Sequence, residues 1–304
     1  MAEQKLRVTT RVGEIAYAAQ GEGPAALFVH GVFLNSCYWR HMMERLSAER
    51  RCLAPDLLGH GDTPAGPDQD VSLRAEAEVL EAFCEALRLD KADVVANDSG
   101  SAIAQIFAAR HPERIRTLTL TNGEADDNYP PVEFRQAVEM AKAGVFSAQR
   151  EAFAADVGLL RPGFAAGYEN IDAVSDETLR SYVQPLFATP QATRVLERWL
   201  VSIEDTRQTK DIEPLLRRLD APTLIVWGAA DPFFPLKWAY WLKGLIPGAK
   251  KVMELEGARL FFPEERPDEL AEAIRAHWRE SARDGLRIAE PVGERERSAS
   301  LIAS

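Results

Sequence analysis

One acidic residue stands where the sequence predicts a sharp turn from a strand into a helix. Asp98 follows the run Val94-Val95-Ala96-Asn97, which predicts a strand, and the segment from Gly100 to Phe107 predicts a helix. Small residues two positions before and after, Ala96 and Gly100, let strand and helix approach and hold the side chain between them in a strained, exposed conformation. A carboxylate held in this way could displace a leaving group at a saturated carbon and form an ester that water then hydrolyses.

Four further segments have residue types, and a spacing along the chain, that fit the same chemistry. They are His30-Gly31-Val32-Phe33, Asp56 to Thr63, Trp227-Gly228-Ala229-Ala230-Asp231, and Glu256 to Leu270. In this order and at the ends of expected strands, they resemble the motifs of the α/β-hydrolase superfamily, with Asp98 in the place of the serine of G-x-S-x-G. The alternative register makes Ser99 the nucleophile and puts Asn97 in a small-residue slot that it fits poorly.

An aspartate at this turn resembles haloalkane dehalogenases, fluoroacetate dehalogenases and cap-bearing epoxide hydrolases more than serine esterases. The resemblance implies Asp98 as the nucleophile and Asp231 as the acid of the triad. It also implies an oxyanion hole formed by the backbone N–H groups of Val32 and Ser99. The implied fold is α/β, with a mostly parallel eight-stranded sheet flanked by helices and an inserted helical cap.

The sequence departs from this family at the catalytic base. Alignment of the segment before Pro267 with the family's A-G-H-F-x-x-E-E-R-P ending puts Leu260 at the histidine position and Arg259 at the preceding glycine. Without a base, activation of water is expected to slow by about 10² to 10⁴. His30 is the nearest histidine; we expect it to be structural, with proton transfer as the alternative. Arg259 either pairs with Asp231 or stays a surface charge.

The expected pocket is apolar and aromatic. Ser99 and Val32 replace the tryptophan and asparagine that hold halide in dehalogenases, so halide stabilisation should be poor. The cap tyrosines Tyr129, Tyr168 and Tyr182 could supply the two phenols that protonate an opening epoxide; Tyr182 is the preferred candidate, with packing as the alternative role of each. Aromatic residues on the two loops expected to face Asp98 are Phe233, Phe234, Trp238, Phe261 and Phe262. The expected pocket residues are His30, Phe33, Phe233, Phe261, Arg259 and Leu260.

Three acidic residues follow another expected strand end. Glu124, Asp126 and Asp127 come just after the strand at 116–121 and could approach the site, but a solvated loop is the preferred interpretation. Asn122 stands at the end of that strand, where some relatives place an acid. An amide there cannot serve as that acid.

The elements that must position these residues follow from the pattern of apolar runs. Short strands alternate with segments of helical period, which indicates a mostly parallel sheet covered on both faces. Residues 6–11 and 14–17 predict an antiparallel hairpin, and residues 72–88 predict a helix with Ser72 as N-cap. Further strands are expected at 25–30, 51–55, 92–97, 116–121, 222–227 and 251–255.

The alternation stops between Glu124 and about Asp220. Residues 132–143, 176–187 and 192–203 predict consecutive helices without strands between them. We therefore expect an α/β core formed by 1–124 and 221–285, a helical cap formed by 125–220, and a flexible C-terminal tail at 286–304.

Composition narrows the classes of function. The chain has 304 residues and a formal net charge of −11, which disfavours nucleic-acid binding. No apolar run approaches the length of a membrane span, and the N-terminus does not resemble a secretory signal, so a cytoplasmic location is expected. The three cysteines lack the spacing of a metal site or disulfide framework. We expect no metal, no cofactor and a small-molecule substrate; a homodimer is left open.

Three hypotheses about function remain open. The first is a hydrolase for an epoxide or related small hydrophobic electrophile, with Asp98 as nucleophile. The second is a lyase, isomerase or cyclase of secondary metabolism in which Asp98 acts as acid or base, which predicts a raised pKa for its carboxyl group. The third is a catalytically silent binding protein that keeps the fold and pocket.

Overall fold

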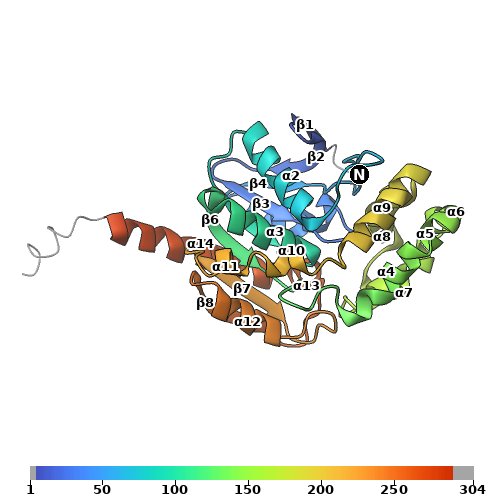
Figure 1. Cartoon of the computed structure of the whole chain (residues 1–304). Coiled ribbons are helices and arrows are strands. Elements are labelled where there is room, and N and C mark those ends of the chain that lie inside the picture. The colour runs from blue at the N-terminus through green and yellow to red at the C-terminus, as the bar shows by residue number, and fades with distance from the viewer. Residues whose placement is uncertain (1–4, 290–304) are drawn as a thin grey trace, which may run out of the picture.

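The predicted sheet is present in the computed structural model, which describes residues 5–289 (Figure 1). It has eight strands in the order β1-β2-β4-β3-β5-β6-β7-β8. β2 pairs antiparallel with β1 and β4, and the remaining pairs are parallel. The strands are β1 (Leu6–Thr10), β2 (Gly13–Gln20), β3 (Ala25–Val29), β4 (Arg51–Pro55), β5 (Ala92–Ala96), β6 (Ile115–Leu120), β7 (Thr223–Gly228) and β8 (Ala249–Leu255).

Helices pack on the sheet through apolar faces. The helices α2 and α3 pack against each other (Figure 1), and α3 packs on β3, β5 and β6. The helices α1 and α14 form a second pair, in which α14 contacts β6 and β7. Ser72 caps α2 as predicted, because its side chain accepts a hydrogen bond from the Ala75 N–H. The core helices are α1 (Arg40–Leu46), α2 (Leu73–Ala86), α3 (Ser99–Arg110), α12 (Lys237–Leu245), α13 (Phe262–Glu265) and α14 (Pro267–Ala289).

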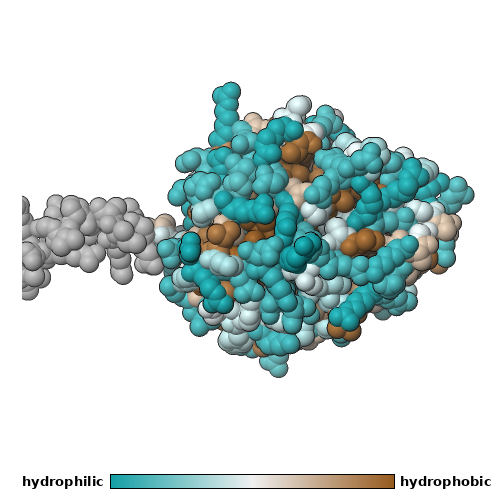
Figure 2. All heavy atoms as spheres, viewed as in Figure 1, coloured by the Kyte–Doolittle hydropathy of each residue, from teal (hydrophilic) through white to brown (hydrophobic). Residues whose placement is uncertain are grey.

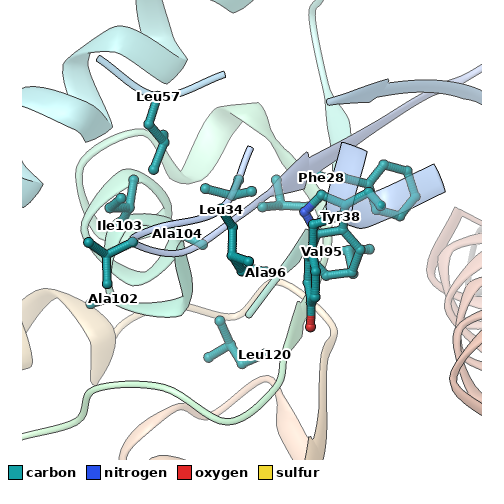
Figure 3. Close-up of a cluster of buried hydrophobic side chains, with 14 of the residues drawn as sticks. Phe28, Leu34, Tyr38, Leu57, Val95, Ala96, Ala102, Ile103, Ala104 and Leu120 are labelled. Carbon is teal, nitrogen blue, oxygen red and sulfur yellow. The ribbon is translucent and has the colours of Figure 1, made fainter. Parts of the chain in front are cut away.

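The central strands are largely apolar on both faces because both faces are covered; the exception in β5 is Asp93, which pairs with Arg50 and Arg116. Every residue of β3 and β5 is buried. Figure 3 shows Phe28 of β3 and Val95 of β5 in one buried cluster with Ala104 of α3 and Leu120 of β6. This packing fixes the carboxyl end of β5, where Asp98 begins the turn into α3.

A helical segment lies between β6 and β7, as the loss of alternation predicts. Its first part forms a layer beside the sheet, at the right of Figure 1. Its last two helices, α10 and α11, pack on α3 instead, so this end of the expected cap lies against the core. The α-helices are α4 (Arg135–Lys142), α5 (Val145–Ala148), α6 (Arg150–Ala155), α7 (Arg161–Ala165), α8 (Asp176–Phe187), α9 (Pro190–Ser202), α10 (Arg207–Lys210) and α11 (Glu213–Leu216).

The surface is mainly hydrophilic, and apolar residues on the face shown in Figure 2 form small separate patches. Between residues 5 and 289, no helix combines the length and apolar character needed to cross a bilayer. The expected flexible tail begins at 286, but α14 continues to Ala289. The rest of that tail, 290–304, lies outside the described residues.

Candidate active site

The turn at Asp98 has the strained geometry that the sequence predicts. Its backbone has φ 58° and ψ −142°, a region that non-glycine residues rarely occupy, and its N–H donates to the Asn122 carbonyl (2.6 Å). Glycines make room for it. A Cβ at Gly31 would overlap the Asp98 side chain, and a Cβ at Gly100 would overlap the backbone of β3 at Val29. Both positions therefore require glycine, and the Asp98 side chain lies against Gly31.

The two amides predicted to form an oxyanion hole lie at the Asp98 carboxyl group. Hydrogen bonding by the Ser99 and Val32 backbone N–H groups favours its ionised form. The Val32 N–H also donates to the Ser99 hydroxyl at 2.9 Å. This contact gives Ser99 a structural role and ties the end of β3 to the start of α3.

Burial dominates the electrostatics of the two aspartates. The pKa of Asp98 is raised to about 7, chiefly by burial and also by the nearby charge of Asp231, against the opposing hydrogen bonds from the Ser99 and Val32 backbone N–H groups. Burial likewise raises the pKa of Asp231 to about 7, although the Phe233 N–H and the Asn122 amide stabilise its charge. Both groups therefore exchange protons close to neutral pH.

Asp231 has partners other than a histidine. Its carboxylate accepts from Asn122 Nδ2 (2.7 Å) and from the Phe233 N–H (2.9 Å). Arg259, the alternative partner considered from the sequence, donates instead to the Tyr168 carbonyl (3.3 Å), and within residues 5–289 it forms no ion pair with Asp231. Asn122 thus stabilises the Asp231 carboxylate and does not take the place of that acid.

Leu260 lines a cavity at Asp98, and its carbonyl accepts from Asn97 Nδ2 (3.0 Å). All five histidines belong to the described part of the chain, yet none is among the residues that line this cavity. His30 is wholly buried: its Nδ1 contacts the Gly31 carbonyl (2.8 Å) and its Nε2 accepts from the Leu57 N–H (3.1 Å). This agrees with a structural role for His30 and places it outside the predicted pocket.

The cavity has a volume of about 520 Å³ and walls that are largely aromatic. Phe33 joins the core to the helical layer, since its ring centroid lies 6.0 Å from that of Phe146 and 6.2 Å from that of Phe134. Leu260, Phe33, Phe233 and Phe261 line it as predicted, whereas Arg259, Trp238 and Phe262 are not among the described lining residues. The helical layer contributes aromatic rings that sequence reasoning missed, namely Phe134, Phe146, Phe153, Phe164 and Trp199.

The cap tyrosines lie away from the cavity lining. Tyr182, the preferred candidate acid, donates to Glu264 Oε1 (2.8 Å) and accepts from Arg40 (2.7 Å). Tyr168 donates to Glu264 Oε2 (2.5 Å). The Tyr129 hydroxyl contacts Gln208 at 3.4 Å. None of the three is among the lining residues of the described cavity, so their hydroxyls do not face Asp98.

Glu124 is the ionisable residue that the sequence interpretation placed wrongly in a solvated loop. Only 3% of it is exposed, and it lines the cavity together with Asp98. Asp127, three positions later, is exposed as expected. The apolar neighbour Ala125, which is fully buried, was a signal that the loop turns inward at this point.

Comparison with known proteins fits this geometry. A family model described as alpha/beta hydrolase fold matches residues 24–266. The chain belongs to this family. Relatives include a haloalkane dehalogenase of Agrobacterium fabrum, 29% identical over 60% of this chain and 59% of that protein. A pimeloyl-[acyl-carrier protein] methyl ester esterase of Neisseria meningitidis is 27% identical over 85% of this chain and 93% of its own.

Among solved structures, an alpha/beta hydrolase fold protein from Burkholderia ambifaria matches with a TM-score of 0.79 and 25% identity, over 90% of this chain and 98% of its own. The family includes hydrolases of haloalkanes and of esters among these relatives, so membership does not select a substrate. Within residues 5–289, no cluster of three or more histidine, cysteine or acidic residues could hold a metal ion.

Proposed function

We propose that this alpha/beta hydrolase fold protein hydrolyses a small, neutral, hydrophobic epoxide through a covalent ester on Asp98. One observation carries the proposal: the Asp98 carboxyl group meets the Ser99 and Val32 amides and also lines an aromatic cavity. One carboxylate oxygen can attack a saturated carbon. The amides then stabilise the oxyanion when water adds to the ester carbonyl.

The donors at the site favour an epoxide over a haloalkane. A departing halide needs N–H donors inside the cavity, and the one tryptophan among the described lining residues, Trp199, points its Nε1 at Glu76 (3.3 Å). An epoxide keeps its leaving oxygen attached and needs a proton instead. The cavity contains carboxyl groups that can supply one.

The charge of the cavity favours a neutral substrate. Its ionisable residues, within the described chain, are Asp98, Glu124 and Glu133, and no lysine or arginine is among them. A carboxylate-bearing substrate would find no positive charge to pair with among these lining residues in a poorly solvated space, which is unfavourable. Fluoroacetate-like substrates are therefore disfavoured.

The test is detection of the ester. The protein is incubated with styrene oxide, cyclohexene oxide and trans-stilbene oxide in H₂¹⁸O over several turnovers, and the peptide containing Asp98 is analysed by mass spectrometry. We expect ¹⁸O in the Asp98 carboxyl group and in the diol, together with an adduct of the mass of the epoxide after rapid quenching. Diol formation without label in Asp98 would contradict the proposal.

A second candidate has an observation of its own. The pKa of Asp98, raised to about 7 by burial, suits proton transfer at neutral pH in a lyase, isomerase or cyclase. Here Asp98 moves a proton and forms no ester. An activity that is lost in Asp98→Asn while no adduct or ¹⁸O label is found would favour this candidate over the first.

A further inference from the structure

The proposed epoxide hydrolysis needs two proton transfers that Asp98 cannot perform alone. A donor must protonate the oxygen of the opening epoxide, and a base must deprotonate the water that attacks the ester. Tyr182 and Tyr129 are not among the described residues that line the cavity, nor is any of the five histidines. The donor and the base must therefore come from another group.

Glu124 is the one deeply buried ionisable group that shares the cavity with Asp98 in the described chain. Glu133, the third carboxyl group of the lining, is exposed to solvent. Glu124 is 3% exposed, and Asp98 is 6% exposed. Among the described lining residues, Asp98 and Glu124 are therefore the buried groups that can donate or accept a proton.

The backbone holds Glu124 against the turn at Asp98. A Cβ added to the neighbouring Gly123 would overlap the Asp98 carbonyl oxygen and the Ser101 side chain, so the two segments are in direct contact. Gln105 of α3 donates through Nε2 to the Glu124 carbonyl (2.9 Å). The side chain therefore extends from a fixed point beside the nucleophile.

The Glu124 carboxyl group has an oxygen without an assigned role. Oε2 is buried and has no hydrogen-bond partner among the described residues. Buried polar atoms are nearly always paired, because an unpaired one costs about 1 to 3 kcal/mol. Because Glu124 lines the cavity, rotation of its carboxyl group can present this oxygen to a bound molecule.

We propose that Glu124 is a second catalytic residue, which donates its proton to the epoxide oxygen and then, as a carboxylate, deprotonates the hydrolytic water. This inference rests on the proposed epoxide hydrolysis. It assigns two roles to Glu124: the proton donor, for which the family resemblance suggests cap tyrosines, and the base, which is a histidine in the family.

The protons balance over the cycle. In the first step an Asp98 oxygen bonds to an epoxide carbon, the C–O bond breaks, and the released oxygen takes the Glu124 proton to give a hydroxyalkyl ester. In the second step Glu124 takes a proton from water, and the hydroxide adds to the ester carbonyl at the Ser99 and Val32 amides. Collapse releases the alkoxide, which takes the proton of the new Asp98 carboxyl group. The products are the diol, ionised Asp98 and protonated Glu124.

The electrostatics support this assignment. Burial raises the pKa of Glu124 well above its usual value, and the Asp98 charge raises it further. The Asp231 charge acts on Asp98, the Glu124 charge acts on Tyr129, and Glu133 lies on the cavity lining; none of these groups adds positive charge. Above about pH 7, where Asp98 is ionised, the pair therefore holds one proton, with Glu124 the preferred site.

The first test is a rapid-quench experiment with styrene oxide on Glu124→Gln. We expect ester formation to slow by about 10² or more and ester hydrolysis by about 10² to 10⁴, so that the Asp98 adduct persists. Asp127→Asn is the matched control, because it makes the same change on the same loop in an exposed side chain that does not line the cavity. We expect its rates to equal those of the wild type.

Two further measurements separate a chemical role from a structural one. Formate should partly restore ester hydrolysis in Glu124→Ala, because a free carboxylate can enter the space left by the side chain. In the infrared spectrum at pH 7, Glu124→Gln should lose one protonated carboxyl band. Glu124→Asp, which keeps the carboxyl group, serves if Glu124→Gln does not fold, and should hydrolyse the ester faster than Glu124→Ala.

The outcomes distinguish the two proposals. Ester hydrolysis at the wild-type rate in Glu124→Gln, or an unchanged infrared spectrum, would overturn the role of Glu124 and leave the Asp98 ester standing. Absence of any ester in the wild type, with all three epoxides, would overturn the proposed function and with it this step. A persistent ester in Glu124→Gln that formate resolves in Glu124→Ala supports both.

Discussion

Two buried glutamates of this chain, Glu124 and Glu264, show how differently a carboxyl group can be used. Glu264, at the start of α13, accepts hydrogen bonds from Arg40 and Tyr182 at Oε1 and from Tyr168 at Oε2. Glu124 has an oxygen without any partner in the described residues and faces the cavity. The two residues are similarly buried: Glu264 is 8% exposed and Glu124 is 3% exposed.

This difference in hydrogen bonding indicates different roles for the region around Glu264 and the region around Glu124. The Glu264 cluster, formed by Arg40, Tyr168, Tyr182 and Glu264, connects the core helices α1 and α13 to the helical layer. A carboxylate whose two oxygens both accept hydrogen bonds stabilises the packing of the segments that it connects. A carboxyl group left unpaired beside a nucleophile can change its protonation during a reaction. We therefore expect loss of Glu264 to affect stability and loss of Glu124 to affect rate.

Asp98→Asn should give the largest effect of all, because it removes the nucleophile on which the cavity chemistry depends. We expect ester formation with styrene oxide to fall by about 10⁴-fold or more. The amide is nearly isosteric, so the fold should persist, and the far-ultraviolet circular dichroism spectrum should match that of the wild type. Diol formation by Asp98→Asn at the wild-type rate would show that Asp98 is not the nucleophile. The contrast between a catalytic Glu124 and a structural Glu264 would then lose its basis.

Glu264→Gln should affect stability rather than chemistry. It breaks a buried ion pair with Arg40, whose side chain is 35% exposed, so the loss of unfolding free energy should be about 2 to 3 kcal/mol, below the value for a fully buried pair. Urea denaturation measures this loss. Glu124→Gln is the contrasting variant, and its unfolding free energy should change by about 1 kcal/mol or less.

A stability loss in Glu124→Gln as large as that in Glu264→Gln would contradict the comparison. So would loss of ester hydrolysis in the Glu264 variant while its fold is intact.

Local signals were sufficient to predict the sheet and the turn at Asp98. Largely apolar runs such as β3 and β5 require cover on both faces, and the small residues around Asp98 leave few backbone solutions. Ser72 predicted the start of α2 because its capping bond is made within one turn. Each of these features depends on neighbours in sequence.

The contents of the cavity could not be predicted in the same way, because they depend on contacts between distant segments. Tyr182 seemed a candidate acid from its place in a helix, but its hydroxyl is bound by Arg40 and Glu264, residues that lie 142 and 82 positions away. Glu124 looked solvated among acidic neighbours. Its burial follows from the helical layer and from the contact of Gly123 with the Asp98 turn.

The pH dependence of ester formation should sharpen the comparison. Asp98 must be ionised to attack, and burial raises its pKa to about 7, so the rate should rise roughly tenfold per unit below pH 7. The rate should fall again at higher pH, when Glu124, whose pKa burial raises well above its usual value, loses the proton it must donate. Single-turnover rates from pH 5 to 10 measure both limbs.

Glu124→Gln should abolish the falling limb and keep the rise. Stability supplies a check of the sign: folded Asp98 binds a proton more tightly than in the unfolded chain, so unfolding free energy should fall as pH rises from about 4 to 7. Asp98→Asn should flatten this decline. A single ascending limb in the wild type would argue against Glu124 as the donor.

Tyr182→Phe should give the smallest effect, and it tests whether the Glu264 cluster takes part in catalysis. The substitution removes one hydroxyl that donates to Glu264 and accepts from Arg40, while Glu264 keeps its other partners. We expect a loss of unfolding free energy of about 1 to 2 kcal/mol and rates of ester formation and hydrolysis within about twofold of the wild type. A fall of tenfold or more in ester formation would show that the hydroxyl reaches the epoxide, and the Glu264 cluster would then belong to the chemistry rather than to the attachment of the helical layer.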